Sequence, residues 1–372
     1  MRVVFLAENY HRFYDRFGAA HPELAGLDYD VVQQRMFEEF FYQADSHAAA
    51  LRKLGHEAFT IIPDCIPLQR QWAREHGLSM PPYRKRMPGL MEGLWRLAAG
   101  CGYREAWHAR VLAAQLAHYR PDVVQVFSGV RMTGPMLKRL RRHARKWICQ
   151  WACPIREAYP YEAYDLILTT AENFVEEFTR RGVACRKIQH AFDERIVPHL
   201  ELNQAGAGVV FVGSLSPQHV ERTAMLEAVA REVPLDAYGE GFDALPPESA
   251  LRAAWRGGAK FGLEMYRLYA RHGIALHVPG EVGRAFAGAK RLFEITGAGC
   301  LLLAEAQPGL AEYFVVGQEI DVFRDAAEAV RKIRRYLEDE PLRRALAAAG
   351  KQRTLRDHVY GVRMKEWLHA VA

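Results

Sequence analysis

The sequence predicts an α/β protein with two doubly wound parallel sheets, each covered by helices. The chain has 372 residues, which suits two domains better than one core. Short apolar runs alternate with amphipathic stretches along the whole chain, which is typical of parallel strands connected by helices. Residues 198–208 interrupt this pattern with a stretch of linker composition that includes Pro198, Gly206 and Gly208. We therefore expect one α/β domain on each side of this stretch.

The first half opens with an apolar run at residues 3–7, which we expect as a buried strand. A helical pattern follows from 31 to 54 and ends at Gly55. The turn Arg120-Pro121-Asp122 introduces a strand at 123–127. The remaining elements expected in this half are strands at 58–62, 147–152, 166–169 and 187–190, and a helix at 173–182.

The second half begins with a strand at 209–212, and further strands are expected at 235–238, 275–278 and 300–304. Asp325 and Glu328 form a capping box at the start of a helix. Pro341 fits the first position of the next helix and Gly350 its C-cap. Residues 360–368 form a last amphipathic helix. We expect domains at 1–204 and 205–355, with 356–372 as a C-terminal segment.

Composition limits the class of protein. Half of the residues are hydrophobic and the net charge is +6, as in an ordinary globular protein. The N-terminus has the pattern of a strand rather than a signal peptide, and no run reaches the ~18–20 apolar residues of a membrane span. We expect a cytoplasmic protein whose cysteines are reduced structural thiols. The basic run 138–146 is either a solvated helix face or a peripheral contact with anionic lipid at the inner membrane face. No nucleic-acid-binding signature accompanies it.

The first candidate ligand site follows the strand 209–212. Gly213 lets the backbone approach a ligand closely, and Ser214 can donate to phosphate oxygens at the start of a helix. A tight turn with a serine cap explains the same residues equally well. Arg222, in the first turns of that helix, is a further candidate.

The second candidate site follows the strand 275–278 and a Gly-rich loop. Lys290 and Arg291 lie at a helix N-terminus, where cations are unfavourable and a bound diphosphate would offset their charge. Glu294 lies on nearly the same helix face and could accept hydrogen bonds from a ribose diol. The alternative is an intrahelical ion pair, worth only ~0.3–0.5 kcal/mol.

The segment 290–305, KRLFEITGAGCLLLAE, resembles the donor-binding core of GT-B glycosyltransferases, closest to the CgeB-like branch. The similarity extends over residues 209–368, including Gly309. It implies two Rossmann-like domains facing a cleft and a last helix that crosses back to the first domain. It also implies that Glu294 binds the donor ribose and that Lys290 and Arg291 face the diphosphate. Many retaining relatives carry two glutamates with seven residues between them, and at the earlier of these positions this chain has Phe286.

This resemblance implies a metal-independent glycosyltransferase with no cofactor besides a UDP-, GDP- or dTDP-sugar. The acceptor would be a saccharide or lipid-linked saccharide in surface polysaccharide or glycoconjugate synthesis. Glu8 and His11, directly after the first strand, are our candidates for the base that activates the acceptor hydroxyl. Asp193, after the strand 187–190, is a third candidate base, and we expect the turn 128–131 to line the cleft. Asp28-Tyr29-Asp30 has the form of a metal-binding motif but precedes a helix, so we expect no metal there.

Two other functions fit the same fold. A nucleotide-sugar 2-epimerase would share the donor site but need no acceptor surface. A non-catalytic GT-B module would bind a nucleotide sugar without turnover, and the phenylalanine at 286 is compatible with it.

Overall fold

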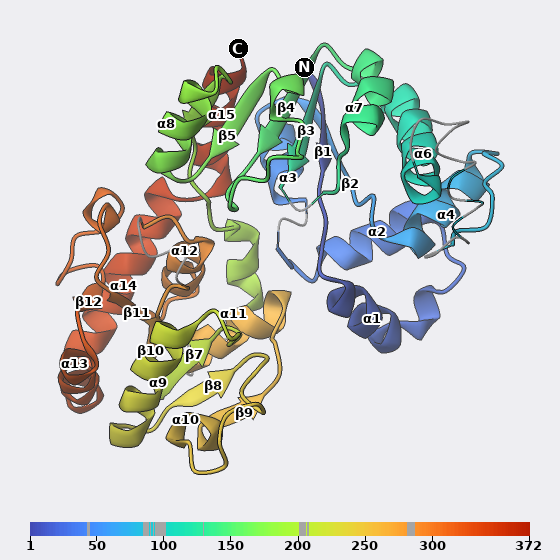
Figure 1. Cartoon of the computed structure of the whole chain (residues 1–372). Helices are drawn as coiled ribbons and strands as arrows, with labels where there is room; N and C mark the ends of the chain where they lie inside the picture. The colour runs from blue at the N-terminus through green and yellow to red at the C-terminus, as the bar shows by residue number, and fades with distance from the viewer. Residues whose placement is uncertain are drawn as a thin grey trace. The chain divides into compact units, whose positions relative to one another are not determined.

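The computed structural model describes the chain except residues 43–44, 85–88, 90, 92, 94–101, 129, 201–205, 207 and 281–286. It divides into two compact units (Figure 1). Unit 1 comprises Met1–Ile188 and Met364–Ala372, and unit 2 comprises Gln189–Arg363. These bounds differ from the expected 1–204, 205–355 and 356–372. The residues after 188 pack within unit 2, where the backbone N–H of Phe192 donates to the carbonyl of His358 at 2.8 Å.

Unit 1 is built on a six-stranded parallel sheet of order β2-β1-β3-β4-β5-β6. The strands lie close to the expected positions, although β6 comes before the expected 187–190. Neighbouring residues such as Val3 and Val4 on β1, and Val123 and Val124 on β3, are all buried, so these central strands are covered on both faces, as is typical of parallel sheets. Their bounds are β1 Arg2–Leu6, β2 Glu57–Ile61, β3 Val123–Phe127, β4 Lys146–Gln150, β5 Leu166–Thr169 and β6 Cys185–Lys187.

Helices connect these strands, and one expected helix is wrong. Residues 31–54 form two helices, because Phe40 and Tyr42 adopt φ values of 50° and 53° in the left-handed region, which ends a right-handed helix. Phe41 between them stacks on Phe13 with ring centroids 4.5 Å apart. The helices of unit 1 are α1 His11–Ala20, α2 Tyr29–Phe37, α3 Ser46–Lys53, α4 Ile66–Glu75, α6 Tyr103–Tyr119, α7 Gly134–Leu140 and α8 Glu172–Arg180.

The last helix, α15, spans Tyr360–Val371, and its residues from Met364 onward belong to unit 1. Trp367 is fully buried there, with its ring centroid 5.9 Å from that of Phe5 on β1. The indole N–H donates to the side-chain carbonyl of Gln125 on β3. The expected return of the C-terminus to the first domain is therefore confirmed, with the indole of Trp367 buried in unit 1.

Unit 2 contains a second six-stranded parallel sheet, of order β12-β11-β10-β7-β8-β9. Leu276 and Leu303 belong to the core on one of its faces, together with residues of α9 and α13. The strands are β7 Val209–Val212, β8 Asp236–Tyr238, β9 Trp255–Gly257, β10 Ile274–His277, β11 Leu301–Glu305 and β12 Asp321–Phe323. The two sheets confirm the predicted fold class.

The helices of unit 2 include the expected N-cap at Asp325, but the expected C-cap at Gly350 is wrong. Asp325 Oδ1 accepts from the backbone N–H of Glu328 at 2.7 Å, as the capping box predicts. Gly350, however, does not end its helix, which continues to Asp357. It is a packing residue instead, because a Cβ there would lie 2.3 Å from the carbonyl oxygen of Glu319. The helices are α9 Val220–Glu232, α10 Ala250–Ala253, α11 Gly262–Arg271, α12 Lys290–Gly297, α13 Ala326–Glu338 and α14 Glu340–Asp357.

No helix among the described residues combines the length and the apolar character that crossing a bilayer requires.

Candidate functional site

Strand order locates the ligand-binding edge of each sheet. In unit 1 the order reverses between β1 and β3, and in unit 2 between β7 and β10. Open α/β sheets bind ligands beyond the carboxyl ends of the strands at such a point of reversal. The residues that follow β1 and β3, and those at the ends of β7 and β10, are therefore the first place to look for a site in each unit.

In unit 2 the turn after β7 brings three predicted residues together. Nη1 of Arg222 donates to the carbonyl of Ser214 at 3.0 Å and lies 3.3 Å from Nδ1 of His219. Gly213 directly precedes Ser214 and donates its N–H to the carbonyl of Tyr238 at 2.9 Å. Arg222 is therefore fixed against the turn at the carboxyl edge of β7.

Two adjacent turns approach each other very closely at this edge. Gly239, which follows β8, has φ +154°, and a Cβ there would lie 2.1 Å from the carbonyl oxygen of Gly213. The hydroxyl of Ser214 accepts from the N–H of Glu240 at 3.3 Å. Glycine at 239 thus holds the two turns side by side, and the hydroxyl of Ser214 already has a protein donor.

The start of α12 carries the charged part of the site. Lys290 and Arg291 are its first two residues, as predicted. Glu294 lies one turn along, with Oε1 3.6 Å from Nζ of Lys290 and Oε2 3.0 Å from Nη1 of Arg291. The Tyr266 hydroxyl donates to Glu294 at 3.2 Å. Burial alone would raise the pKa of Glu294, but Arg291, Lys290 and this hydrogen bond hold it below its ordinary value.

The structure adds His277, which the sequence reasoning missed. It is the last residue of β10, is 7% exposed, and its Nε2 has no hydrogen-bond partner among the described residues. Burial, then the charges of Arg291 and Arg222, lower its pKa to about 3. A histidine at the end of a buried strand was the available signal. Arg222 belongs to the first predicted group and Arg291 to the second, and the charges of both lower the pKa of His277.

The remaining donor-side predictions concern Gly309, Phe286 and the Gly-rich loop. Gly309 lies in the turn after β11, with φ +81°, before a short helical turn at Leu310–Glu312. Phe286 and most of the Gly-rich loop lie outside the described residues. A cavity of about 590 Å³ in unit 2 is bounded by α9 residues and the segment 241–249 and includes none of the predicted donor residues.

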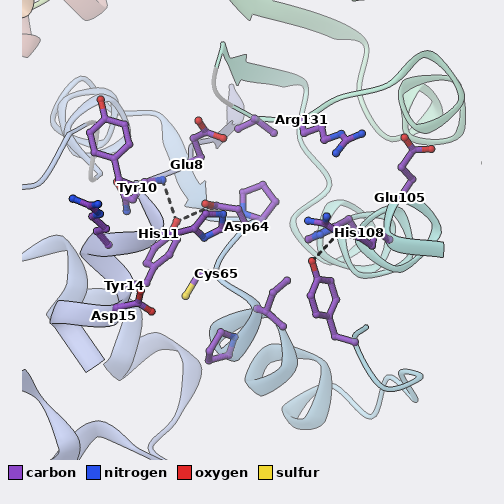
Figure 2. Close-up of a pocket in the computed structure, with 18 of the residues that line it drawn as sticks. Glu8, Tyr10, His11, Tyr14, Asp15, Asp64, Cys65, Glu105, His108 and Arg131 are labelled. Atoms are coloured by element: carbon purple, nitrogen blue, oxygen red, sulfur yellow. Dashed lines mark hydrogen bonds between the residues drawn. The ribbon is translucent and has the colours of Figure 1, made fainter. Parts of the chain in front are cut away.

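Unit 1 has a larger cavity, of about 1280 Å³, at the corresponding edge of its sheet (Figure 2). Its walls come from the segments after β1, β2 and β3 and from α6. Both predicted catalytic residues line it: Glu8 follows β1, and His11 is the first residue of α1. The volume exceeds the ~300–1,000 Å³ of ordinary ligand pockets.

Glu8 shares this cavity with a second carboxyl group, that of Asp64, which follows β2. Oδ1 of Asp64 accepts from the hydroxyl of Tyr14 at 2.7 Å, and that hydroxyl accepts from the N–H of Asn9 at 3.0 Å. Burial, then the charge of Asp64, raise the pKa of Glu8 to about 7, against the charge of Arg156. Burial likewise raises the pKa of Asp64 to about 6. Asp64 was missed, although it follows a predicted strand directly.

The remaining candidates have other partners. Asp193 is paired with Arg195, whose Nη2 lies 2.6 Å from Oδ2, and it caps a short helix. Asp28 is the residue before α2, and the described residues contain no cluster of three or more His, Cys, Asp or Glu side chains arranged to hold a metal.

Parts of the basic run 138–146 also make internal contacts. Arg141 forms two hydrogen bonds to Asp165, and Nζ of Lys146 donates to the carbonyl of Val371 at 2.5 Å. These contacts give the expected membrane contact no support, and it stays a prediction.

Comparison with known protein families gives one match. Residues 222–369 match the family described as "Glycosyl transferase-like". The matched segment contains Arg222, His277, Lys290, Arg291 and Glu294. No curated protein sequence matches the chain significantly.

Solved structures match over the whole chain. A glycosyltransferase from Rickettsia africae has a TM-score of 0.57 at 11% identity, covering 99% of this chain and 97% of its own. Anabaena HepE, solved with UDP and glucose, has a TM-score of 0.56 at 12% identity, covering 100% and 99%. Sucrose-phosphate synthase from Thermosynechococcus elongatus has a TM-score of 0.57 at 14% sequence identity, and the match covers 100% of this chain and 98% of the synthase chain. At these identities the likeness establishes the fold, which is that of GT-B glycosyltransferases.

Proposed function

We propose that this chain, a GT-B glycosyltransferase, moves a sugar from a nucleotide diphosphate sugar bound by unit 2 to an acceptor hydroxyl activated in unit 1. The observation that carries the proposal is the charged group at the start of α12, inside the segment that matches the glycosyl transferase-like family. That match and the GT-B neighbours favour transfer over a 2-epimerase or a non-catalytic module.

The leaving group is the nucleoside diphosphate, whose bond to the anomeric carbon breaks. Arg222, Lys290 and Arg291 are the cations proposed to stabilise its charge, together with the N-terminal end of α12. His277 offers a further donor, since its uncharged imidazole adds a hydrogen bond without adding like charge beside the two arginines. We assign Glu294 to the ribose diol.

The acceptor hydroxyl must lose its proton as its oxygen attacks the anomeric carbon. We propose that Glu8 accepts this proton, because a carboxylate with a pKa near 7 is a much stronger base than an ordinary glutamate. Asp64 contributes to that basicity through its negative charge. His11 lines the same cavity and its charge stabilises the ionised form of Asp64, so we treat it as a supporting residue.

The donor proposed first is a UDP-sugar, because HepE is solved with UDP-glucose and with UDP. GDP- and dTDP-sugars have the same diphosphate and are its alternatives. The proposed acceptor is a saccharide or lipid-linked saccharide. We propose that side chains and a helix terminus bind the diphosphate and that no metal ion takes part.

A thermal-shift screen tests this function. UDP, GDP, dTDP, CMP and ADP are compared with and without EDTA on the wild type, on Glu294→Gln and on Glu340→Gln. Glu340 forms an exposed pair with Arg344 at 2.6 Å and is the matched control. A ligand at ~100 times its Kd stabilises the fold by ~2.7 kcal/mol. We expect such a shift with one diphosphate, unaffected by EDTA, retained in Glu340→Gln and lost in Glu294→Gln. The absence of a shift with any nucleotide would contradict the donor site.

A further inference from the structure

The cavity of unit 1 carries carboxyl groups on one side and arginines on the other. Figure 2 shows Glu8, Tyr14 and Asp64 on one side, and His108 and Arg131, together with Glu105, on the other. Arg104 lines the cavity as well, one turn before His108 on α6. The cavity therefore has carboxyl groups where the acceptor hydroxyl is proposed to react and guanidinium groups elsewhere on its wall.

Neither Arg104 nor Arg131 forms an ion pair with a carboxylate in the described part of the chain. Nε of Arg104 donates to the hydroxyl of Tyr83 at 3.1 Å, and its guanidinium lies 5.9 Å from the centre of that ring. The nearby Glu105 accepts instead from the backbone N–H of Gly102 at 3.2 Å, which caps α6.

The pKa of His108 is lowered in part by the positive charges on this side of the cavity. Burial, then the charges of Arg104 and Arg131, lower its pKa to about 4, although a hydrogen bond with the backbone of Pro63 opposes the shift. Its other ring neighbours are uncharged, namely Tyr83, with ring centroids 5.7 Å apart, and Trp107, at 5.3 Å. A neutral imidazole that feels the charges of two guanidinium groups is suited to receive an anion, which would draw a proton onto it.

We propose that the acceptor is a saccharide carrying a phosphate or a carboxylate, which Arg104 and Arg131 bind across the cavity from Glu8. This inference rests on the proposed function of the chain. The charge pattern would also orient the acceptor. Glu8 and Asp64 repel the anionic group, so that the hydroxyl end faces the carboxyl groups and the anionic end faces the guanidinium groups.

Calorimetric binding of glucose, glucose 1-phosphate and glucuronate to the full chain tests the proposal, with saturating UDP present to block the donor site. We expect at least one charged sugar to bind about tenfold or more tightly than glucose. Comparing the phosphate with the carboxylate identifies the anionic group. Repetition in buffers of different ionisation enthalpy should reveal proton uptake on binding, because the anion raises the pKa of His108.

The variants Arg104→Gln and Arg131→Gln, and their double variant, are compared with Arg110→Gln. Arg110 is an exposed arginine on the same helix and does not line the cavity. We expect the double variant to lose the preference for charged sugars and Arg110→Gln to keep it. Equal binding of charged and neutral sugars, no binding of either charged sugar, or an unchanged preference in the double variant overturns the inference. UDP binding is measured separately, so that its failure would contradict the donor site instead.

Discussion

Nη1 of Arg291 lies 3.0 Å from Oε2 of Glu294, one turn further along α12. The carboxylate is 9% exposed, and it also lies 3.6 Å from Nζ of Lys290. Glu294 therefore compensates two cations at a helix N-terminus, where positive charge is unfavourable. The sequence left open whether Glu294 pairs with these cations or binds ribose. In the structure it forms the pair, and binding ribose with one of its two oxygens is compatible with that pair.

Glu294→Gln should destabilise the chain, because it leaves two poorly exposed cations without a counter-charge. We expect a loss of about 1–3 kcal/mol in the free energy of unfolding, measured with denaturant. Glu340→Gln removes an exposed pair and should cost under ~1 kcal/mol. Equal losses in the two variants would contradict this account.

Glu8→Gln should make the chain more stable at pH 8 and leave it unchanged at pH 4. The folded pKa of Glu8, about 7, lies above its unfolded value, 4.5, so that the folded state binds the extra proton between these values. Stability is therefore lost as pH rises through this window, by about 1–3 kcal/mol. The variant has no such carboxyl group and should escape that loss. Denaturant unfolding at both pH values measures it, with the exposed Asp15→Asn as control. A variant no more stable than the wild type at pH 8 would show that ionisation of Glu8 does not destabilise the folded chain.

His277→Asn should reduce the sensitivity of the fold to mild acid. The folded pKa of His277, about 3, lies below its unfolded value, 6.5, and stability is lost as pH falls below 6.5, because the unfolded chain takes up the proton first. Each such histidine costs up to about 1.4 kcal/mol per pH unit in this range. Burial lowers the pKa values of His108 and His190 as well, so the variant should lose only part of the sensitivity to acid. Melting temperatures at pH 7 and 5 measure it. The exposed His369→Asn should behave as the wild type, and identical curves for both variants would refute the assignment.

Gly350→Ala and Gly361→Ala should have opposite effects, although both glycines lie in helices. A Cβ at 350 would lie 2.3 Å from the carbonyl oxygen of Glu319, whereas one at 361 meets nothing within 4 Å. We expect a loss of about 1–3 kcal/mol at 350 from overpacking. At 361 we expect a gain of up to ~1 kcal/mol from helix propensity. Thermal unfolding of the two variants measures the difference. A neutral Gly350→Ala would mean that α14 can shift away from Glu319.

The parts of the fold that could be predicted depend on neighbours in the sequence. The strands near 3–7, 123–127 and 209–212 follow from unbroken apolar runs, and the cap at Asp325 follows from one residue three positions away. The charged face of α12 was predictable for the same reason, since residues three and four apart must meet on a helix.

The errors have the opposite origin. Nothing in the helical pattern of 31–54 indicates the left-handed residues Phe40 and Tyr42. Gly350 has the sequence signature of a helix end, but the structure uses its missing side chain for contact with Glu319, which is distant in the sequence.

The sequence by itself determined two α/β units, the carboxyl edges that carry the candidate sites, and the group Lys290, Arg291 and Glu294. Local periodicity encodes all of these. Tertiary structure alone decided that Asp64 and Tyr14 join Glu8, that His277 lies under the influence of Arg222 and Arg291, and that Arg104 and Arg131 line one cavity without a carboxylate partner among the described residues. Most of these relationships join residues that are far apart in the sequence. The order of the strands in each sheet creates them, and no local pattern in the chain records that order.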